Sequence, residues 1–268
     1  MDYTPQELMV VSAAREIHDG EVVFVGMRLP LLAFGLAKET HAPNAVGLFE
    51  NGLVRDRPSS ELLYTMSDSP NVAGALWCTR MINVMGFLAR GEVDLGFIGG
   101  AEIDRYGNLN TSYIPSAGPS TGSGGASGRR GGPEHVQVKL PGSGGAADIA
   151  CLARRLIIIM AHEKRRFVPQ VGYVTSPGHG EGQGWRERVG VPGGGPAAVI
   201  TTLGVLTADP DNRELMLHSY HPFTTSEEVR TNTGWDLRLS PDLHKTPPPT
   251  PEELAIIRRY DPQGFWTR

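Results

Sequence analysis

Apolar residues recur at helical spacing in the first twenty positions of the chain. Thr4, Pro5 and Glu7 form a capping box with proline at the first helical position, which predicts a helix that begins at residue 5. The apolar stripe of this helix and the glycine that ends it follow in order: Leu8, Val11, Ala14, Ile17 and Gly20. The chain is therefore expected to open with one capped helix.

Short apolar runs then predict buried strands. Residues 21–25 and 46–49 have this pattern, and residues 31–39 between them have a helical one. Strand, helix and strand at this spacing form a βαβ unit, so we expect a sheet that is parallel at its centre. Residues 93–98 and 156–160 predict further buried strands.

The last third of the chain has a different pattern. Residues 197–202, 204–208 and 214–219 predict an antiparallel meander. Two short capped helices are expected to follow, the first opening at Thr225 and the second at Thr250. We interpret this part as an antiparallel C-terminal elaboration of an α/β fold.

No composition shift marks a domain boundary, so residues 1–268 are expected to form a single α/β domain. A segment rich in Gly and Ser at residues 116–141 is interpreted as a loop insertion. The pentapeptide Gly-Ser-Gly-Gly-Ala occurs within it at residues 122–126, and again at residues 142–146. Only the second copy is followed by a helical pattern.

Composition and charge exclude several classes of protein. A net charge of −4 argues against a general affinity for nucleic acid, which needs a basic face. No apolar run approaches the ~20 residues of a membrane span, and the first residues lack the features of a signal peptide. Two cysteines, Cys78 and Cys151, are too few for a disulfide scaffold or a cysteine-rich zinc site, and the histidines show no metal-ligand spacing. We expect a cytoplasmic protein that binds neither metal, nucleic acid nor membrane.

A carboxylate at the end of an apolar strand is the leading candidate for chemistry. Glu50 directly follows the run at residues 46–49 and precedes Asn51-Gly52. Ligands of α/β proteins usually bind in the crevice at the carboxyl ends of the strands. A positioned and partly desolvated carboxylate there can act as a nucleophile in acyl transfer. The alternative is an ordinary surface glutamate before an Asn-Gly turn.

Three further loops carry candidate residues. The glycines of residues 141–146 expose backbone N–H groups that can hold a phosphate or an oxyanion, unless the loop is only a linker. Gly99 and Gly100 follow a strand and precede Glu102, so a ligand can approach the backbone closely, although a simple hairpin explains the pattern equally well. Arg28 precedes a predicted helix, and it is either a carboxylate clamp or a solvated side chain.

Taken together, these motifs resemble the B (β) subunit of the class I coenzyme A-transferases, and glutaconate CoA-transferase in particular. The resemblance runs almost end to end. The matching motifs are Ala42-Pro43-Asn44 before Glu50-x-Gly52, Gly99-Gly100-Ala101-Glu102-Ile103-Asp104, Tyr106-Gly107-Asn108-Leu109-Asn110, Gly142-Ser143-Gly144-Gly145-Ala146, Glu163-Lys164-Arg165-Arg166-Phe167, Val174-Thr175-Ser176-Pro177-Gly178 and Asn232-Thr233-Gly234. The family fold, called CoA-transferase or NagB-like, is an open, mostly parallel α/β sheet with helices on both faces.

The resemblance implies roles for these residues. Glu50 falls on the nucleophile of the family, and Gly144 and Gly145 fall on its oxyanion-stabilising glycine loop. The remaining expected substrate contacts lie on neighbouring loops: Arg28, Asn51, Gly99, Gly100 and Glu102. The implied reaction is ping-pong transfer through a glutamyl-CoA thioester, in which coenzyme A is a substrate and no cofactor is permanently bound.

Two residues depart from the family pattern, and both concern the acyl group. Arg28 stands where glycine is usual, and Glu102 stands where glutamine is usual. The acyl specificity is therefore expected to differ from glutaconate.

Two alternatives to transfer stay open. Some relatives on this fold are CoA-thioester hydrolases, ring-opening enzymes or decarboxylases, and a catalytically silent binding protein is the other possibility. The class needs an A (α) subunit to complete its active site. This chain is therefore expected to act on acyl-CoA and carboxylic acids within a hetero-oligomer.

Overall fold

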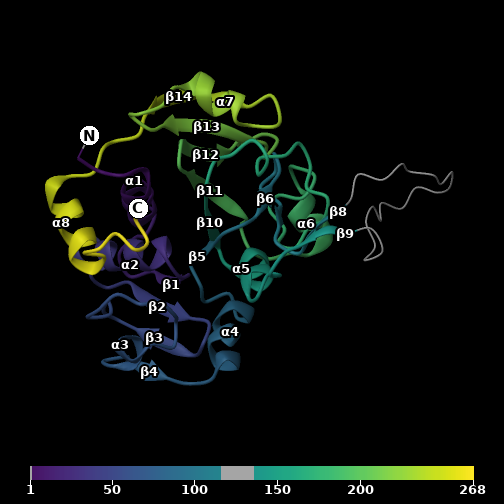
Figure 1. Cartoon of the computed structure of the whole chain (residues 1–268). Helices are drawn as coiled ribbons and strands as arrows, with labels where there is room; N and C mark the ends of the chain where they lie inside the picture. Colours follow the sequence, from purple (N-terminus) through teal and green to yellow (C-terminus); the bar gives the residue numbers. More distant parts are fainter. Residues whose placement is uncertain (1, 116–135) are drawn as a thin grey trace.

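A ten-stranded sheet organises the chain in the computed structural model, which describes residues 2–115 and 136–268 (Figure 1). From one edge to the other, the strands are β14 (Arg238–Lys245), β13 (Leu215–Tyr220), β12 (Gly204–Ala208), β11 (Pro196–Thr201), β10 (Arg155–Met160), β5 (Leu95–Ile98), β1 (Val22–Phe24), β2 (Val46–Phe49), β3 (Leu53–Arg55) and β4 (Trp77–Cys78).

The middle of the sheet is parallel, as the βαβ pattern predicts. Neighbouring strands run parallel from β11 through β10, β5 and β1 to β2. Antiparallel strands extend this block on both sides, β12 and β13 beyond β11, and β3 and β4 beyond β2. The predicted C-terminal meander is thus confirmed, and it continues the main sheet. The edge strand β14 pairs in parallel with β13.

Helices cover both faces of the sheet. The helices are α1 (Pro5–Arg15), α2 (Leu29–Glu39), α3 (Ser69–Val72), α4 (Met81–Ala89), α5 (Ala146–Leu152), α6 (Trp185–Val189), α7 (Ser226–Thr231) and α8 (Pro251–Tyr260). Two small hairpins lie outside the main sheet, β6 (Glu102–Ile103) with β7 (Leu109–Asn110), and β8 (Tyr113–Pro115) with β9 (Val136–Lys139). Among the described residues, no helix is both long enough and apolar enough to cross a membrane.

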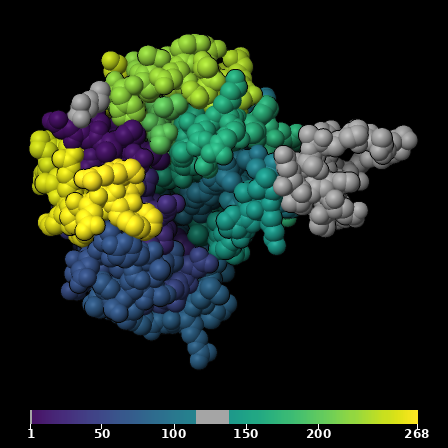
Figure 2. Space-filling view, viewed as in Figure 1, coloured from purple at the N-terminus to yellow at the C-terminus, as the bar shows by residue number. Residues whose placement is uncertain are grey.

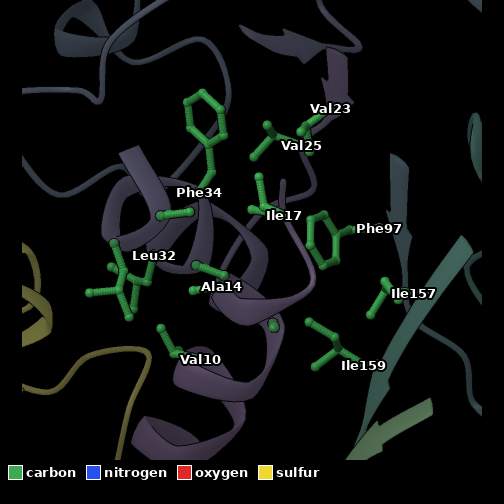
Figure 3. Packing of buried hydrophobic residues seen from close by; sticks show 14 of the residues in the cluster. Val10, Ala14, Ile17, Val23, Val25, Leu32, Phe34, Phe97, Ile157 and Ile159 are labelled. Atoms are coloured by element: carbon green, nitrogen blue, oxygen red, sulfur yellow. The ribbon is translucent and has the colours of Figure 1, made fainter. Parts of the chain in front are cut away.

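Alternate residues of the central strands enter two different cores. Ile157 and Ile159 of β10 pack with α1, α2 and α8 on one face, and Figure 3 shows them in the same cluster as Ala14 of α1 and Ile17, which follows this helix. Leu156 and Ile158 join the other core, with residues of α4, α5 and α7. Side chains alternate between the faces of a strand, so a strand covered on both sides reads as a continuous apolar run.

The capping box of α1 is confirmed, but the predicted end of this helix is wrong. Thr4 Oγ1 accepts the Glu7 backbone N–H at 3.1 Å, and the Glu7 carboxylate accepts the Thr4 N–H at 2.8 Å. The helix ends at Arg15 because the N–H groups of Glu16 and Ile17 donate to carbonyls three residues back, which tightens the last turn. Gly20 therefore lies in the connection to β1.

The Gly/Ser-rich segment is described only in part. Residues 136–139 form β9, whereas the first Gly-Ser-Gly-Gly-Ala copy at residues 122–126 lies outside the described residues. The second copy leads directly into α5, as the pattern after residue 146 predicts.

Candidate active site

Three of the predicted loops meet at one edge of the sheet. Strands β5, β1 and β2 are parallel neighbours, so their carboxyl ends lie side by side. Arg28 lies in the loop after β1, Glu50 directly follows β2, and Gly99 directly follows β5. The loop after β1 packs closely against the end of β5, because a Cβ atom at Gly26 would lie 3.5 Å from the Phe97 carbonyl oxygen.

The glycine loop reaches the same edge from another element. Helix α5 leads into β10, which runs parallel to β5, so the start of α5 lies near the carboxyl ends of the strands. Gly142 donates its N–H to the Thr111 carbonyl at 2.7 Å and ties the loop down. Gly145, the residue before α5, donates its backbone N–H to Glu50 Oε1 at 3.1 Å. The strand-end carboxylate and the glycine loop are therefore direct neighbours.

Glycine is required where this loop faces the carboxylate. A Cβ atom at Gly145 would lie 3.1 Å from Glu50 Oε1 and 3.2 Å from its Cδ, and one at Gly144 would lie 3.6 Å from Oε1. Gly144 also has a φ of +51°, which L side chains rarely adopt. A side chain at either position would press on the half-buried carboxylate or strain the loop.

The turn after Glu50 holds the neighbouring segment in place. Gly52 has a φ of +102°, and a Cβ atom there would overlap the Thr79 carbonyl. Asn51 donates its side-chain amide to the Met66 carbonyl at 2.7 Å. Its Oδ1 atom is buried and has no hydrogen-bond partner among the described residues. The Asn51 amide thus ties the turn to the segment before α3, and one acceptor beside Glu50 remains unpaired.

The loop after β5 is the hairpin that the sequence allowed as an alternative. Glu102 lies in β6 and accepts the Asn110 side-chain N–H from β7 at 2.8 Å. A Cβ atom at Gly100 would lie 2.7 Å from Leu109 Cδ2, and one at Gly99 would lie 3.3 Å from the Ile159 carbonyl oxygen. Close packing within the protein therefore explains both glycines.

Sequence reasoning missed the pair that holds this hairpin. Asp104 is buried, and it accepts the backbone N–H of Tyr106 and of Asn108 at 3.0 and 3.1 Å. Burial raises the pKa of Asp104, and the hydrogen bonds from Asn108 oppose that rise. Asn108 Oδ1 in turn accepts the N–H of Gly178 at 2.9 Å. The available signal was an Asp and an Asn four residues apart, at the end of the Gly99 motif and within the Tyr106 motif.

Arg28 has an unusual backbone and an aromatic support. It precedes α2 with φ +68° and ψ −122°, angles that turns normally reserve for glycine. Such a conformation costs about 1–3 kcal/mol in a residue with a side chain. Its guanidinium lies 4.9 Å from the centroid of the Trp266 ring. Within the described part of the chain, it makes no ion pair and no side-chain hydrogen bond. Trp266 had no sequence signal, because the two residues are distant along the chain.

This arrangement suits nucleophilic chemistry by a carboxylate. Glu50 is held at the end of a buried strand, with a backbone N–H donor beside it and a second glycine preceding that donor. Such donors stabilise the charge that develops on a carbonyl oxygen when a nucleophile attacks it. In residues 2–115 and 136–268, no group of three or more His, Cys, Asp or Glu side chains is placed to hold a metal ion.

Known proteins match this chain along most of its length. The Coenzyme A transferase family model matches residues 7–232. The chain is 35% identical over 257 residues to the B subunit of 3-oxoadipate CoA-transferase from Pseudomonas knackmussii, and 36% identical over 265 residues to the B subunit of glutaconate CoA-transferase from Acidaminococcus fermentans. Each alignment covers 96% of this chain and 92% of the relative.

Solved structures share the fold. The crystal structure of glutaconate coenzyme A-transferase from Acidaminococcus fermentans superposes with a TM-score of 0.87 at 34% identity, and the match covers 100% of this chain and 98% of that one. The decarboxylase AibA/AibB matches with a TM-score of 0.80 at 27% identity, covering 99% and 98% of the two chains. The predicted fold class is confirmed by these superpositions.

Proposed function

The chain belongs to the coenzyme A-transferase family as a class I B-type subunit, and from this premise we propose that Glu50 carries coenzyme A between two carboxylic acids. The observation that supports this role is the hydrogen bond of 3.1 Å from the Gly145 N–H to Glu50 Oε1. In this proposal the carboxylate is the nucleophile and the N–H is an oxyanion donor, and both lie at the edge of the sheet where α/β proteins usually bind ligands.

The first half of the reaction transfers coenzyme A to the enzyme. A Glu50 oxygen attacks the thioester carbonyl carbon of the donor, the C–S bond breaks, and a mixed anhydride and a CoA thiolate form. The thiolate then attacks the glutamyl carbonyl carbon, and the C–O bond of the anhydride breaks. This step releases the donor acid and leaves a glutamyl-CoA thioester on Glu50.

The second half runs the same steps in reverse. An acceptor carboxylate attacks the glutamyl thioester, which gives a new mixed anhydride and a CoA thiolate. Attack of the thiolate on the acyl carbonyl carbon forms the new acyl-CoA and restores Glu50. Each addition places negative charge on a carbonyl oxygen, and the backbone N–H groups of Gly144 and Gly145 would stabilise it by a few kcal/mol per donor.

The acyl group is proposed to carry a second carboxylate. The two relatives above one third identity are named for 3-oxoadipate and glutaconate, which are both dicarboxylic acids. Arg28 offers an exposed guanidinium on the loop beside Glu50, and a planar guanidinium suits a carboxylate. Asn51, Gly99, Gly100 and Glu102 remain proposed neighbours of the acyl group.

The proposed active form contains an A subunit. The relatives are named as B subunits, and each alignment covers 92% of the relative. Coenzyme A is proposed to enter as a substrate, with no permanently bound cofactor.

Trapping the covalent intermediate tests this function. The chain is co-expressed with an A subunit and offered a panel of acyl-CoAs, and intact mass is used to detect coenzyme A added to this chain. Borohydride reduction and peptide mapping then locate the adduct. An adduct on Glu50 that is absent in Glu50→Gln is the expected result.

Other outcomes support the alternatives. Consumption of acyl-CoA in water without any adduct would favour a hydrolase or a decarboxylase, and the latter activity is named for the structural relative AibA/AibB. No adduct and no turnover with any thioester would favour a catalytically silent partner protein.

A further inference from the structure

We infer that Trp266 is a positioning residue for substrate selectivity, because it holds the Arg28 guanidinium at the mouth of the site. This inference rests on the proposed function and deepens it. The ring lies 4.9 Å from the guanidinium carbon of Arg28, within the range of a cation–π contact. No carboxylate and no hydrogen-bond acceptor of the described residues holds Arg28 in place instead.

Trp266 is itself firmly fixed. Its indole N–H donates to the Leu63 carbonyl at 3.1 Å, and its backbone N–H donates to Asp261 at 2.8 Å. The ring is partly buried against the core that includes α1 and α2. A support fixed from both the ring and the backbone can define where a long and flexible arginine side chain lies.

Asp261 organises the whole segment that carries this ring. Its buried carboxylate accepts the backbone N–H groups of Phe265, Trp266 and Thr267, and also the Thr267 hydroxyl at 3.0 Å. The Thr267 carbonyl accepts the Thr4 hydroxyl at 2.6 Å. Residues 261–268 thus form a closed turn attached to the cap of α1.

The same segment lies against the part of the chain that follows Glu50. Phe265 meets Tyr64 edge to face, with ring centroids 4.9 Å apart. Figure 2 shows the yellow C-terminal part of the chain lying against the blue part. Residues 261–268 therefore connect the loop of Arg28 with the segment that Asn51 anchors through Met66.

The backbone of Arg28 supports a role for its side chain. Glycine adopts φ +68° and ψ −122° more easily than arginine does. The Arg28 guanidinium forms no ion pair with any of the described residues. Arg28 follows β1, and β1 is the parallel neighbour of the strand that ends at Glu50. A charged group in a strained position on that loop, resting on an aromatic face, is suited to contact an anionic part of the substrate. This anionic part is the distal carboxylate of the acyl group, and Trp266 orients the guanidinium toward it.

A selectivity assay separates this role from a general loss of structure. The complex with the A subunit is loaded with coenzyme A from acetyl-CoA and then chased with glutarate or butyrate, acids that differ in the second carboxylate. Trp266→Leu is expected to raise the half-saturating concentration of glutarate about fivefold, with the maximal rate and the butyrate reaction unchanged. Trp266→Phe keeps an aromatic face and is expected to restore most of the difference.

Two further variants complete the kinetic test. Arg28→Gly is expected to raise the half-saturating concentration of glutarate at least as much as Trp266→Leu does, and the double variant is expected to lose no more than Arg28→Gly alone. Phe87→Leu removes a similar contact, in which the Arg90 guanidinium lies 4.8 Å from the Phe87 ring on α4, and it serves as the matched control. Equal losses for glutarate and butyrate, or additive losses in the double variant, would overturn the inference.

A binding experiment makes the inference independent of the chemistry at Glu50. In the Glu50→Gln complex, glutarate is expected to protect Arg28 from modification by phenylglyoxal, as measured by peptide mass mapping. Trp266→Leu is expected to require about fivefold more glutarate for the same protection. Failure of glutarate to protect Arg28, or protection that Trp266→Leu does not change, would refute the positioning role even if the Glu50 adduct forms.

Discussion

Glu50 and Gly145 are 95 residues apart along the chain, yet one hydrogen bond joins them. In the resting enzyme, the Glu50 carboxylate uses an N–H group that the proposed reaction later needs for the carbonyl oxygen under attack. The same donor can therefore orient the nucleophile before the reaction and stabilise charge during it. The fit depends on the absence of a side chain at position 145.

Adding one methyl group at this position tests the fit. Gly145→Ala would place a Cβ atom 3.1 Å from Glu50 Oε1, so the carboxylate must shift and its hydrogen bond must lengthen. We expect kcat for CoA transfer to fall about a hundredfold, the effect of losing one oxyanion donor. Steady-state kinetics of the complex with the A subunit measures this.

A second glycine provides the control. A Cβ atom at Gly86 of α4 would also have its nearest neighbour at 3.1 Å, but that atom is the mobile end of the Arg90 side chain. Gly86→Ala should therefore leave kcat unchanged and slightly stabilise the helix. Equal activity of the two variants would show that the space beside Glu50 is not critical.

Residue types and positions predicted part of this site. A strand-end glutamate and a glycine loop before a helix are local patterns, and both lie where those patterns place them. The contacts of Arg28 with Trp266 and of Asn51 with Met66 depend on how distant segments pack, which no local pattern reports. The same limit applies to Gly100. The sequence suggested that a ligand approaches its backbone, but the group that does so is the Leu109 side chain.

At the level of elements, two motifs that carry the family resemblance hold the fold together. Gly234 donates its N–H to the Phe167 carbonyl at 2.8 Å, and a Cβ atom at Gly234 would overlap that carbonyl. Thr233 lies 3.1 Å from the imidazole of His162, which stacks on Phe167 with centroids 3.8 Å apart. The motifs at residues 163–167 and 232–234 are thus two sides of one packed contact.

Three buried histidines predict that the protein is destabilised by acid. Burial lowers the pKa of His162 to about 3, and a contribution from His221 adds to the shift. Burial also lowers the pKa of His221 and of His179 to about 4. The unfolded chain binds these protons near pH 6.5 and the folded chain does not, so stability falls as the pH drops below about 6.5.

Denaturation at two pH values tests this effect. Between pH 7 and pH 5, each of the three histidines is expected to lower the free energy of unfolding by roughly 2 kcal/mol. Urea denaturation followed by tryptophan fluorescence measures the difference. His162→Gln should be less stable at pH 7 but lose less on acidification. An unchanged pH dependence in that variant would contradict the assignment to His162.

Local signals also explain which elements were predictable. The central strands are buried on both faces, so their apolar runs are continuous and easily recognised. Strand β4 has only two residues, both exposed, and is too short to show a strand period, whereas β14 is mostly exposed and contains Pro241, so its sequence has no continuous apolar run. Capping residues predicted where one helix begins, because the capping box of Thr250 and Glu253 opens α8 as expected.

At the scale of the whole molecule, one buried arginine connects parts of the chain that lie around α5. Arg186 of α6 donates to the carbonyls of Gly178 and Gly193 at 2.7 and 2.6 Å, and to those of Ala150 and Cys151 at 2.9 and 3.2 Å. The last two carbonyls lie in α5, the helix that begins after Gly145. Arg186 thus helps to fix the helix on which the glycine loop depends.

Removing this guanidinium is expected to destabilise the fold strongly. Arg186→Met fills a similar volume but removes the donor of four carbonyl groups, of which the Cys151 carbonyl still accepts the Gly193 N–H at 2.8 Å. We expect a loss of about 3 kcal/mol or more in the free energy of unfolding. Chemical denaturation measures it. Arg188→Met, on the same helix, removes an exposed side chain with one hydrogen bond to the Gln183 carbonyl and should change stability little. Similar losses in both variants would argue against a special role for Arg186.

The backbone angles of Arg28 also have an evolutionary consequence. By its resemblance to the family, this position usually holds glycine, and the angles found here are those that glycine adopts without strain. In the genetic code, a single base change converts a glycine codon into an arginine codon. A lineage that already carries an aromatic ring at position 266 can therefore gain or lose the guanidinium in one mutational step, while the loop keeps its path. With the role proposed for Arg28, substrate preference in this branch of the family can thus diverge without any change at Glu50 or in the glycine loop.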